Sequence, residues 1–111
     1  MLGYRKLDVY QCACKALPLA HKLAERGDVD TKRQLRRAAL SIMLNIAEGS
    51  GRRDDDQRHF YRVARGSVLE CAAVVDALQE LGLVTAEETV PFEELIVRVV
   101  SMLTRMTQPV R

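Results

Sequence analysis

Residues 34–53 read QLRRAALSIMLNIAEGSGRR, and this stretch decides the fold. Its periodicity predicts a helix over about residues 31–48, which Gly49 should end. Apolar side chains cover most of its circumference: Leu35, Ala38, Ala39, Leu40, Ile42, Met43, Leu44, Ile46 and Ala47. A helix that is apolar nearly all round is buried on more than one side. Because four helices in a bundle have no central member, we interpret the surplus as a contact with another copy of the chain, in a homo-oligomer.

Glycines divide the rest of the sequence into three further segments with helical periodicity. The breaks are Gly27, the pair Gly49 and Gly51, and Gly82. We therefore expect helices over about residues 8–26, 31–48, 54–81 and 85–108, in a single domain that spans residues 1–111. Short links place neighbouring helices antiparallel. The expected fold class is all-α, an antiparallel up-down-up-down four-helix bundle.

The expected helix ends carry typical capping residues. Asp8 is a candidate N-cap of the first helix, and Gly27 should follow that helix in a left-handed conformation. Residues 85–88, Thr-Ala-Glu-Glu, form a capping box at the start of the fourth helix. Pro18 falls inside the first helix and removes one hydrogen bond, so we expect a kink or an interruption there.

The third helix shows the clearest packing pattern. Its steps of four and three residues are typical of a helix packed in a bundle. The residues of this seam are Phe60, Ala64, Ser67, Cys71, Val74, Leu78 and Leu81. Folding the second and third helices back at Gly51 places Arg37 level with Arg65, and it allows Glu70 to pair with a basic residue of the second helix.

Composition excludes several classes of protein. The chain has 111 residues, of which 48% are hydrophobic and 29% charged, with a formal net charge of +2. No apolar run approaches the roughly 20 residues of a membrane span, and the first residues lack the apolar stretch of a signal peptide, so we expect a cytoplasmic protein that binds no membrane. Neither the three cysteines nor His21 and His59 have the spacing of a disulfide framework or a metal site. We expect no metal and no cofactor.

A narrow polar ridge follows one face of the second helix and consists of Gln34, Arg37, Ser41, Asn45 and Glu48. Glu48 lies in the last turn, where a carboxylate opposes the helix dipole, so a cation or a set of hydrogen-bond donors should hold it; Arg52 and Arg53 are the nearest cations. We interpret the ridge as part of a structural polar network that fixes the register of the helices, with a ligand site as the alternative. The expected members of this network are Arg37, Ser41, Asn45, Glu48 and Glu70.

These segments resemble one protein family. Residues 41–49 (SIMLNIAEG), followed by Gly51 and Arg52, look like the signature of the four-helix-bundle proteins encoded in 23S rRNA intervening sequences. Other landmarks are similar to that family in the same order: residues 7–10 (LDVY), residues 34–39 (QLRRAA), Gly66 and Ser67 with Glu70, and Leu81 with Gly82. Because the match covers nearly the whole chain, the sequence is identified as a member of this family.

The resemblance implies a small antiparallel four-helix bundle that assembles into a five-subunit ring, and it implies no known enzymatic activity. The family is also similar in fold to accessory variability proteins of diversity-generating retroelements, which are basic five-membered barrels that bind a reverse transcriptase and nucleic acid. Three positions depart from the family pattern. Tyr10 stands where the family often has Trp, Met43 stands where it often has Pro, and Pro18 lies in a helix that is usually continuous.

Positive charge is concentrated in the middle of the sequence. Residues 32–65 hold nine Lys or Arg against four acids, whereas residues 66–111 hold three basic and seven acidic residues. A stripe of arginines on the third helix continues into the turn before it: Arg52, Arg53, Arg58, Arg62 and Arg65. Because guanidinium forks fit phosphate, we predict that these five arginines bind the backbone of RNA or DNA with little reading of sequence.

Other interpretations remain open. The arginine stripe can be a solvated face whose charges are offset by residues 54–56, three aspartates, and by the acidic fourth helix of a neighbouring copy. Alternatively, the protein can be a scaffold that docks a partner enzyme through an apolar groove, without binding nucleic acid. An enzyme is the least supported class, because the sequence has no nucleophile with a base, no phosphate loop and no metal motif. We therefore expect no catalytic residues.

Overall fold

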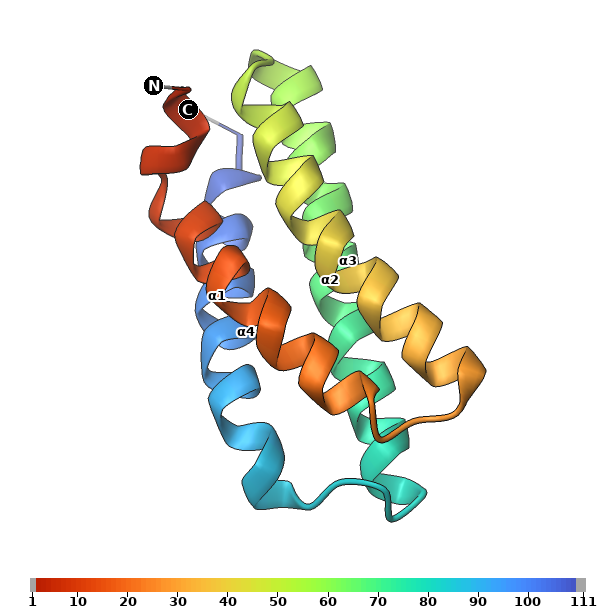
Figure 1. Ribbon diagram of the computed structural model, residues 1–111. Coiled ribbons are helices and arrows are strands. Elements are labelled where there is room, and N and C mark those ends of the chain that lie inside the picture. The colour runs from red at the N-terminus through yellow and green to blue at the C-terminus, as the bar shows by residue number, and fades with distance from the viewer. Residues whose placement is uncertain (1, 110–111) are drawn as a thin grey trace.

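The computed structural model describes residues 2–109 and consists of helices and turns, with no strand among those residues. A short 3₁₀ helix, η1 (Gly3–Lys6), precedes four long helices (Figure 1). These are α1 (Asp8–Ala24), α2 (Val29–Ser50), α3 (Asp54–Glu80) and α4 (Ala86–Met106). The predicted all-α class with four helices is confirmed. None of the helices within residues 2–109 is both long and apolar enough to cross a membrane.

The four helices enclose one core. Each helix packs against its neighbours along the chain, α1 also packs against α4, and the most extensive contact joins α2 to α3. Residue pairs across that contact fall in opposite order, since Ser41 meets Ser67 whereas Gly49 meets Tyr61 nearer the turn. The helices α2 and α3 therefore run in opposite directions. Both ends of the described chain lie at the end of the bundle that holds the α2–α3 turn (Figure 1).

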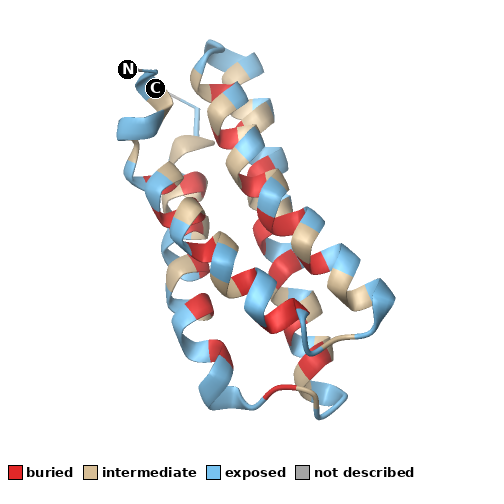
Figure 2. Cartoon of the chain, viewed as in Figure 1, coloured by how far each residue is buried: buried red, intermediate tan, exposed pale blue. Residues whose placement is uncertain are grey.

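The core is filled by large side chains from α2, α3 and α4 and by small ones from α1. Figure 2 shows buried residues at regular intervals along each helix. The largest fully buried side chains include Phe92, Leu35, Ile42, Ile46, Leu78 and Leu103. In α1, by contrast, four alanines (Ala13, Ala16, Ala20 and Ala24) form most of the buried face. Small side chains allow α1 to approach its neighbours closely while the large side chains fill the centre.

Three helix ends show the local chemistry that stops a helix. Thr85 begins α4 with the predicted capping box, in which its Oγ1 accepts a hydrogen bond from the Glu88 amide (3.2 Å) and the Glu88 carboxylate accepts one from the Thr85 amide (3.0 Å). Asp28 caps α2 by accepting a hydrogen bond from the Thr31 amide at 2.9 Å. Gly82 follows α3 with φ +73, a left-handed conformation that glycine adopts without steric cost.

Several predicted ends of α1 and α2 are wrong. Leu7, not Asp8, is the N-cap of α1, and Asp8 lies in the first helical turn. Gly27 does not have a positive φ, because the turn after α1 closes through hydrogen bonds to the carbonyls of Leu23 and Ala24. Pro18 does not interrupt α1; it lies on an exposed side, so its ring is accommodated outside the core.

Gly49 does not end α2 as predicted, because the helix continues to Ser50. The glycine is buried where α2 crosses the start of α3. A Cβ atom at this position would lie 2.8 Å from Cε1 and 2.9 Å from Cδ1 of the Tyr61 ring, closer than real Cβ atoms approach other atoms. Glycine is therefore needed at position 49 because it has no side chain, and not because of a left-handed conformation.

The seam of α3 begins one residue later than predicted. Its buried residues are Tyr61, Ala64, Val68, Cys71, Val75 and Leu78. Phe60, Ser67 and Val74 are half-buried on one flank of this seam, and Leu81 is 60% exposed. The predicted register is also wrong. The link between α2 and α3 extends to Arg53, and Ser41 lies opposite Ser67. Arg37 therefore lies farther from the α2–α3 turn than Arg65 does.

We predict that Gly49→Ala lowers the free energy of unfolding by about 1–3 kcal/mol, because the new methyl group would overlap the Tyr61 ring. The measurement is urea unfolding followed by circular dichroism, with all variants at the same protein concentration. Gly66→Ala is the matched control. A Cβ atom at Gly66 meets nothing within 4 Å, so this change should raise the free energy of unfolding by up to about 1 kcal/mol. Equal stability of the two variants would contradict the close approach.

We also predict that part of the stability is lost in acid. Hydrogen bonds from the amide and hydroxyl of Thr31 lower the pKa of the Asp28 carboxyl below its usual 3.8. A carboxyl with a lowered pKa stabilises the folded state above its unfolded pKa, and this contribution disappears as the pH falls through the folded pKa. Asp28→Asn keeps an N-cap acceptor but removes the titration. Its unfolding free energy should therefore fall less than that of the original chain between about pH 5 and pH 2.

Candidate nucleic-acid interface

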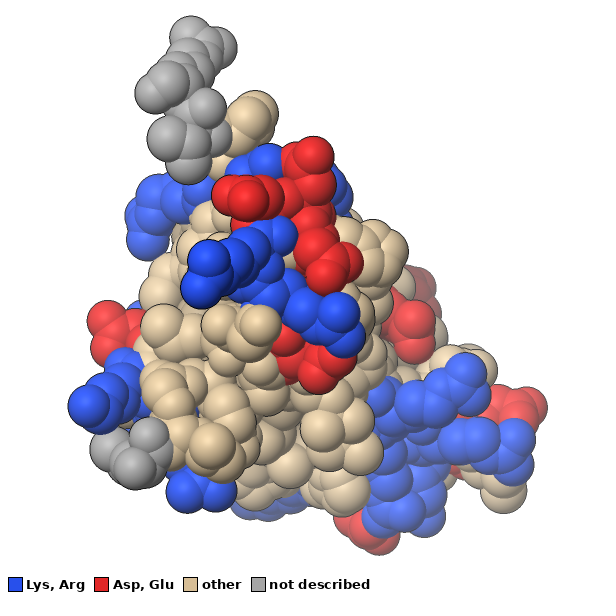
Figure 3. Space-filling model, turned by 90° about the horizontal axis from the view of Figure 1, so that it is seen from above, with Lys and Arg blue, Asp and Glu red and all other residues tan. Residues whose placement is uncertain are grey.

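The five arginines of the predicted binding stripe lie around the α2–α3 turn and along the first half of α3. Arg52 and Arg53 are in the turn, and Arg58, Arg62 and Arg65 are on α3. Figure 3 looks down on this end of the molecule and shows basic and acidic side chains side by side. The acidic side chains include three aspartates in the first turn of α3, where negative charge is favourable beside the positive end of the helix dipole. Three of the five arginines already have a partner among residues 2–109, and two do not.

Arg52 is held by acids of both helices. Its guanidinium lies 2.6 Å from the Glu48 carboxylate and 3.3 Å from that of Asp56, and its Cζ lies 5.1 Å from the centre of the Phe60 ring. The hydrogen bond to Glu48 is the main reason that the pKa of Arg52 is raised. The structure thus supplies the cation expected beside Glu48, and it ties the end of α2 to the start of α3.

Arg58 and Arg65 are also engaged. Arg58 forms an ion pair with Asp55 three residues earlier, and only 19% of its side chain is exposed. Arg65 is half-buried and donates a hydrogen bond from Nε to Oγ1 of Thr104 on α4, at 2.9 Å. This bond joins α3 to α4. It leaves the terminal nitrogens of Arg65 without a partner among residues 2–109.

Arg53 and Arg62 differ from the other three. Both are exposed, and neither has an ion pair or a side-chain hydrogen bond with any residue between 2 and 109. Arg53 is the N-cap residue of α3, and Arg62 follows about two turns later. The two most available cations of the stripe therefore lie at this end of the molecule, beside three arginines that are already positioned by neighbours.

A second basic group lies on the first half of α2, and the predicted site did not include it. Its members are Lys32, Arg33, Arg36 and Arg37, which line a shallow hollow of about 510 Å³ together with Val29 and Leu40. Glu25 at the end of α1 lies 3.9 Å from Lys32 and 2.6 Å from Arg36. Arg33 and Arg37 have no such partner among the described residues. Spacing at i, i+1, i+4 and i+5 is the signal that places these four cations on one helix face.

The expected polar network is brought together only in its middle. Oγ of Ser41 lies 2.8 Å from Oγ of Ser67, and Nδ2 of Asn45 donates to the carbonyl (2.9 Å) and hydroxyl (3.0 Å) oxygens of Ser41. The bond between the two serines links α2 to α3 at a half-buried position, whereas the bonds from Asn45 lie within α2. Glu48 belongs to the separate group around Arg52. Arg37 and Glu70 are exposed and have no ion pair within residues 2–109.

Ser67 is a member of this network that sequence reasoning assigned to the packing seam. A hydroxyl at a seam position, three residues before Glu70 and beside a glycine, is the signal that the seam turns polar there. The Ser67 hydroxyl also lies 3.2 Å from the Val63 carbonyl oxygen of the preceding turn. Because both serines lie on the surface-facing edge of the α2–α3 contact, they hold the two helices together at the rim of the core.

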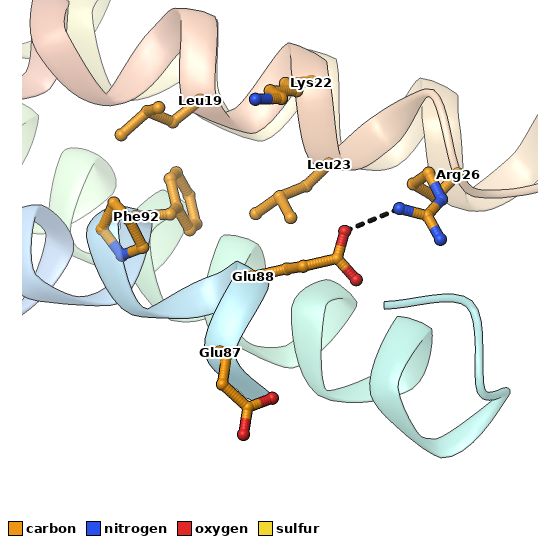
Figure 4. A pocket seen from close by; sticks show the side chains of 8 residues that line it. Leu19, Lys22, Leu23, Arg26, Glu87, Glu88 and Phe92 are labelled. Carbon is orange, nitrogen blue, oxygen red and sulfur yellow. Dashed lines mark hydrogen bonds and ion pairs between the residues drawn. The ribbon is translucent and has the colours of Figure 1, made fainter. Parts of the chain in front are cut away.

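A hollow of about 330 Å³ lies between α1 and α4 (Figure 4). Leu23 and Phe92 form its apolar floor, and Arg26 closes one end through an ion pair of 2.6 Å with Glu88. The amide of Thr85, and more weakly the charge of Arg26, lower the pKa of the Glu88 carboxyl. The ion pair therefore joins the turn that follows α1 to the capped start of α4, and these charged groups hold the two segments together.

A comparison with curated proteins finds no match. A family model described as the 23S rRNA-intervening sequence protein matches residues 5–105, which include all four long helices almost to the end of α4. This match covers the residues that carry the resemblance described above, from the LDVY opening to the turn after α3. The chain therefore belongs to the 23S rRNA-intervening sequence protein family.

Proposed function

We propose that this protein is a non-enzymatic, up-down-up-down four-helix bundle that assembles into a ring-like homo-oligomer in the cytoplasm and binds the phosphate backbone of RNA or DNA. The family resemblance gives five as the number of subunits. The binding residues are Arg52, Arg53, Arg58, Arg62 and Arg65. No cofactor or metal takes part in this function.

The observation that carries the nucleic-acid proposal is the exposure of Arg53, in the α2–α3 turn, and of Arg62, on the first half of α3, neither with a side-chain partner among residues 2–109. A guanidinium without a carboxylate neighbour can offer its fork to a phosphate, and each phosphate that is neutralised releases counterions. Arg58 and Arg65 hold their side chains against the protein and place positive charge on the same stripe. Contacts to phosphate position a nucleic acid but carry no sequence information, so the binding should be insensitive to sequence.

Assembly is supported by apolar side chains that the single chain leaves exposed. Leu40 and Leu44 of α2 are 45% and 58% exposed, and Val63 of α3 is 40% exposed. The surplus of apolar surface on α2 is thus unburied in one copy, as expected of a helix that meets another subunit. A ring would also repeat the arginine stripe around its axis, which raises the local positive potential that attracts a polyanion.

The absence of catalysis is part of the proposal, and two features support it. The charged groups at the closed end of the α1–α4 hollow are occupied by the Arg26–Glu88 ion pair. Of the three free thiols, those of Cys12 and Cys71 are buried, and burial raises the pKa of Cys71 to about 12. A thiol that stays protonated at neutral pH is a poor nucleophile.

A protein-binding scaffold is the second candidate function, favoured by a groove between α2 and α3. Its exposed surface is largely apolar and includes Ala73, Val74 and Ala77 of α3; the polar residues that also line it are Asp30, Thr31, Gln34 and Glu70. In this alternative the ring docks a partner enzyme and does not bind nucleic acid. Capture of one stoichiometric partner from nuclease-treated lysate, with no binding to RNA, would favour the scaffold over the nucleic-acid interface.

We predict that replacing both Arg53 and Arg62 by Ala weakens binding of a fluorescently labelled single-stranded RNA and flattens its dependence on salt. Two lost phosphate contacts should lower the slope of log K against log salt concentration by about 1.4, because each contact contributes about 0.7 for a single strand. Fluorescence anisotropy from low to moderate salt measures this slope. Unfolding should be unchanged, since neither side chain has a partner among the described residues.

The matched control removes two positive charges from α1, those of Lys15 and Lys22, which are also exposed, by substitution with Ala. This control lowers the net charge by the same amount but leaves the α2–α3 end intact. Its salt slope should stay close to that of the original protein. Equal effects of the two double variants would show that net charge, and not the arginine stripe, governs binding. No binding to RNA or DNA at low salt would overturn the nucleic-acid proposal.

A further inference from the structure

Two helices carry strips of opposite charge, each with an exposed apolar side chain at both ends. On α2, Val29, Arg33, Arg37 and Leu40 follow one another at steps of four, four and three residues; we name them the basic strip. On α4, Val90, Glu93, Glu94 and Val97 follow at steps of three, one and three residues; we name them the acidic strip. Both strips thus have the order apolar, charged, charged, apolar.

The basic strip exposes groups that a single chain leaves unpartnered. Val29 is 69% exposed and Leu40 is 45% exposed. Arg33 and Arg37 are exposed and lack an ion pair within residues 2–109, although Lys32 and Arg36 beside them are both paired with Glu25. Glu25 thus neutralises the flank of α2 that faces α1, and the two remaining cations point away from the bundle.

The acidic strip shows a similar pattern with the opposite sign, except that Glu93 is half-buried whereas Glu94 is exposed. Val90 is 45% exposed and Val97 is 60% exposed. Neither Glu93 nor Glu94 forms an ion pair with a residue between 2 and 109, in contrast to Glu88 one turn earlier, which is paired with Arg26. The hollow that the strip lines is also bordered by Arg98, an exposed cation next to Val97 that has no ion pair within residues 2–109 and lies outside the strip.

The two strips cannot meet within one chain. Both α2 and α4 pack against α1 and against α3, so they occupy opposite corners of the bundle (Figure 1). The buried faces of the two helices point toward the same core, for example through Ile42 on α2 and Ile96 on α4. Their exposed faces therefore point in opposite directions. One copy of the chain can use both strips at once, each with a different neighbour.

We propose that the basic strip of one copy packs against the acidic strip of the next copy, so that the subunit contact joins α2 to α4 of its neighbour. This inference rests on the proposed assembly and specifies its interface. The occupant is a second copy of this chain, because the charges match two to two and the apolar ends flank them on both strips. Exposed apolar side chains of both partners would be buried around the ion pairs.

A contact between two different surfaces has a consequence for the shape of the assembly. Such a heterologous contact leaves one strip unused at each end of an open chain of subunits, and it satisfies every strip only when the chain closes into a ring. A symmetric dimer would instead pair a surface with itself, and each strip would then face like charges. The charge pattern thus favours a closed ring over a dimer that uses either strip.

The test reverses the charges of each strip separately and then together. Arg33→Glu with Arg37→Glu makes both strips acidic, and Glu93→Lys with Glu94→Lys makes both basic. Each double variant should lose the assembly and give the mass of a single chain in native mass spectrometry at low salt, because like charges then meet at the contact. The variant with all four changes restores opposite charges and should recover the assembly of the original protein.

The matched control reverses two charges outside both strips, by Lys15→Glu with Lys22→Glu on α1, and should keep the assembly. Circular dichroism confirms that each variant remains helical. An original protein that assembles while both double variants also assemble would overturn this interface but leave the proposed ring intact. Loss of assembly in the double variants without recovery in the fourfold variant would overturn the direct pairing of the strips. A monomeric original protein would overturn the assembly itself.

Discussion

The close packing of α2 against α3 at Gly49 is the constraint on which the rest of the structure depends. Because Gly49 has no side chain, the Tyr61 ring can lie against the backbone of α2 just before the turn. This contact, together with the Ser41 and Ser67 hydroxyls farther along, sets which residues of α3 face the core. The same register decides where the arginines of α3 point, because positions on one helix rotate together. The packing of α2 against α3 thus also determines where the arginines lie on the exposed side of α3.

Helix ends and the arginine stripe compete for the same acids. The three aspartates at the start of α3 suit the positive end of the helix dipole, and Asp55 and Asp56 also pair with Arg58 and Arg52. Exposed ion pairs of this kind stabilise a protein little, typically by less than about 1 kcal/mol. A polyanion can therefore compete with them at small cost. In the proposed interface, the neighbouring acids would weaken the attraction of small anions to the stripe, and Arg53 and Arg62 would make the first contacts with a polyanion.

Much of the fold can be predicted from the sequence because it depends on patterns among residues that are close together in the sequence. The apolar stripe of α4, from Phe92 to Leu103, and the capping box at Thr85 need no knowledge of other helices. The seam of α3 is different. Steps of four and three residues starting at Phe60 or at Tyr61 are equally regular, and the structure selects Tyr61 through its contact with Gly49. Periodicity alone contains no information about that contact.

The candidate site divides in the same way. Spacing on one helix predicts that Arg58, Arg62 and Arg65 share a face, and it also permits the pair of Arg58 with Asp55 three residues away. The bond from Arg65 to Thr104 spans 39 residues and cannot be read from spacing. The prediction also placed Arg37 level with Arg65, which is wrong. It failed because helical periodicity contains no information about the length of the irregular link between α2 and α3.

The position of the chain ends has a practical meaning for work with this protein. Both ends of the described chain lie beside the α2–α3 turn, where the arginine stripe begins (Figure 1). A purification tag or a fluorescent fusion attached to either end would be tethered next to that stripe, and an acidic tag would act as a tethered competitor for it. The two loops at the opposite end, between α1 and α2 and between α3 and α4, are where a label can be inserted far from the stripe (Figure 1).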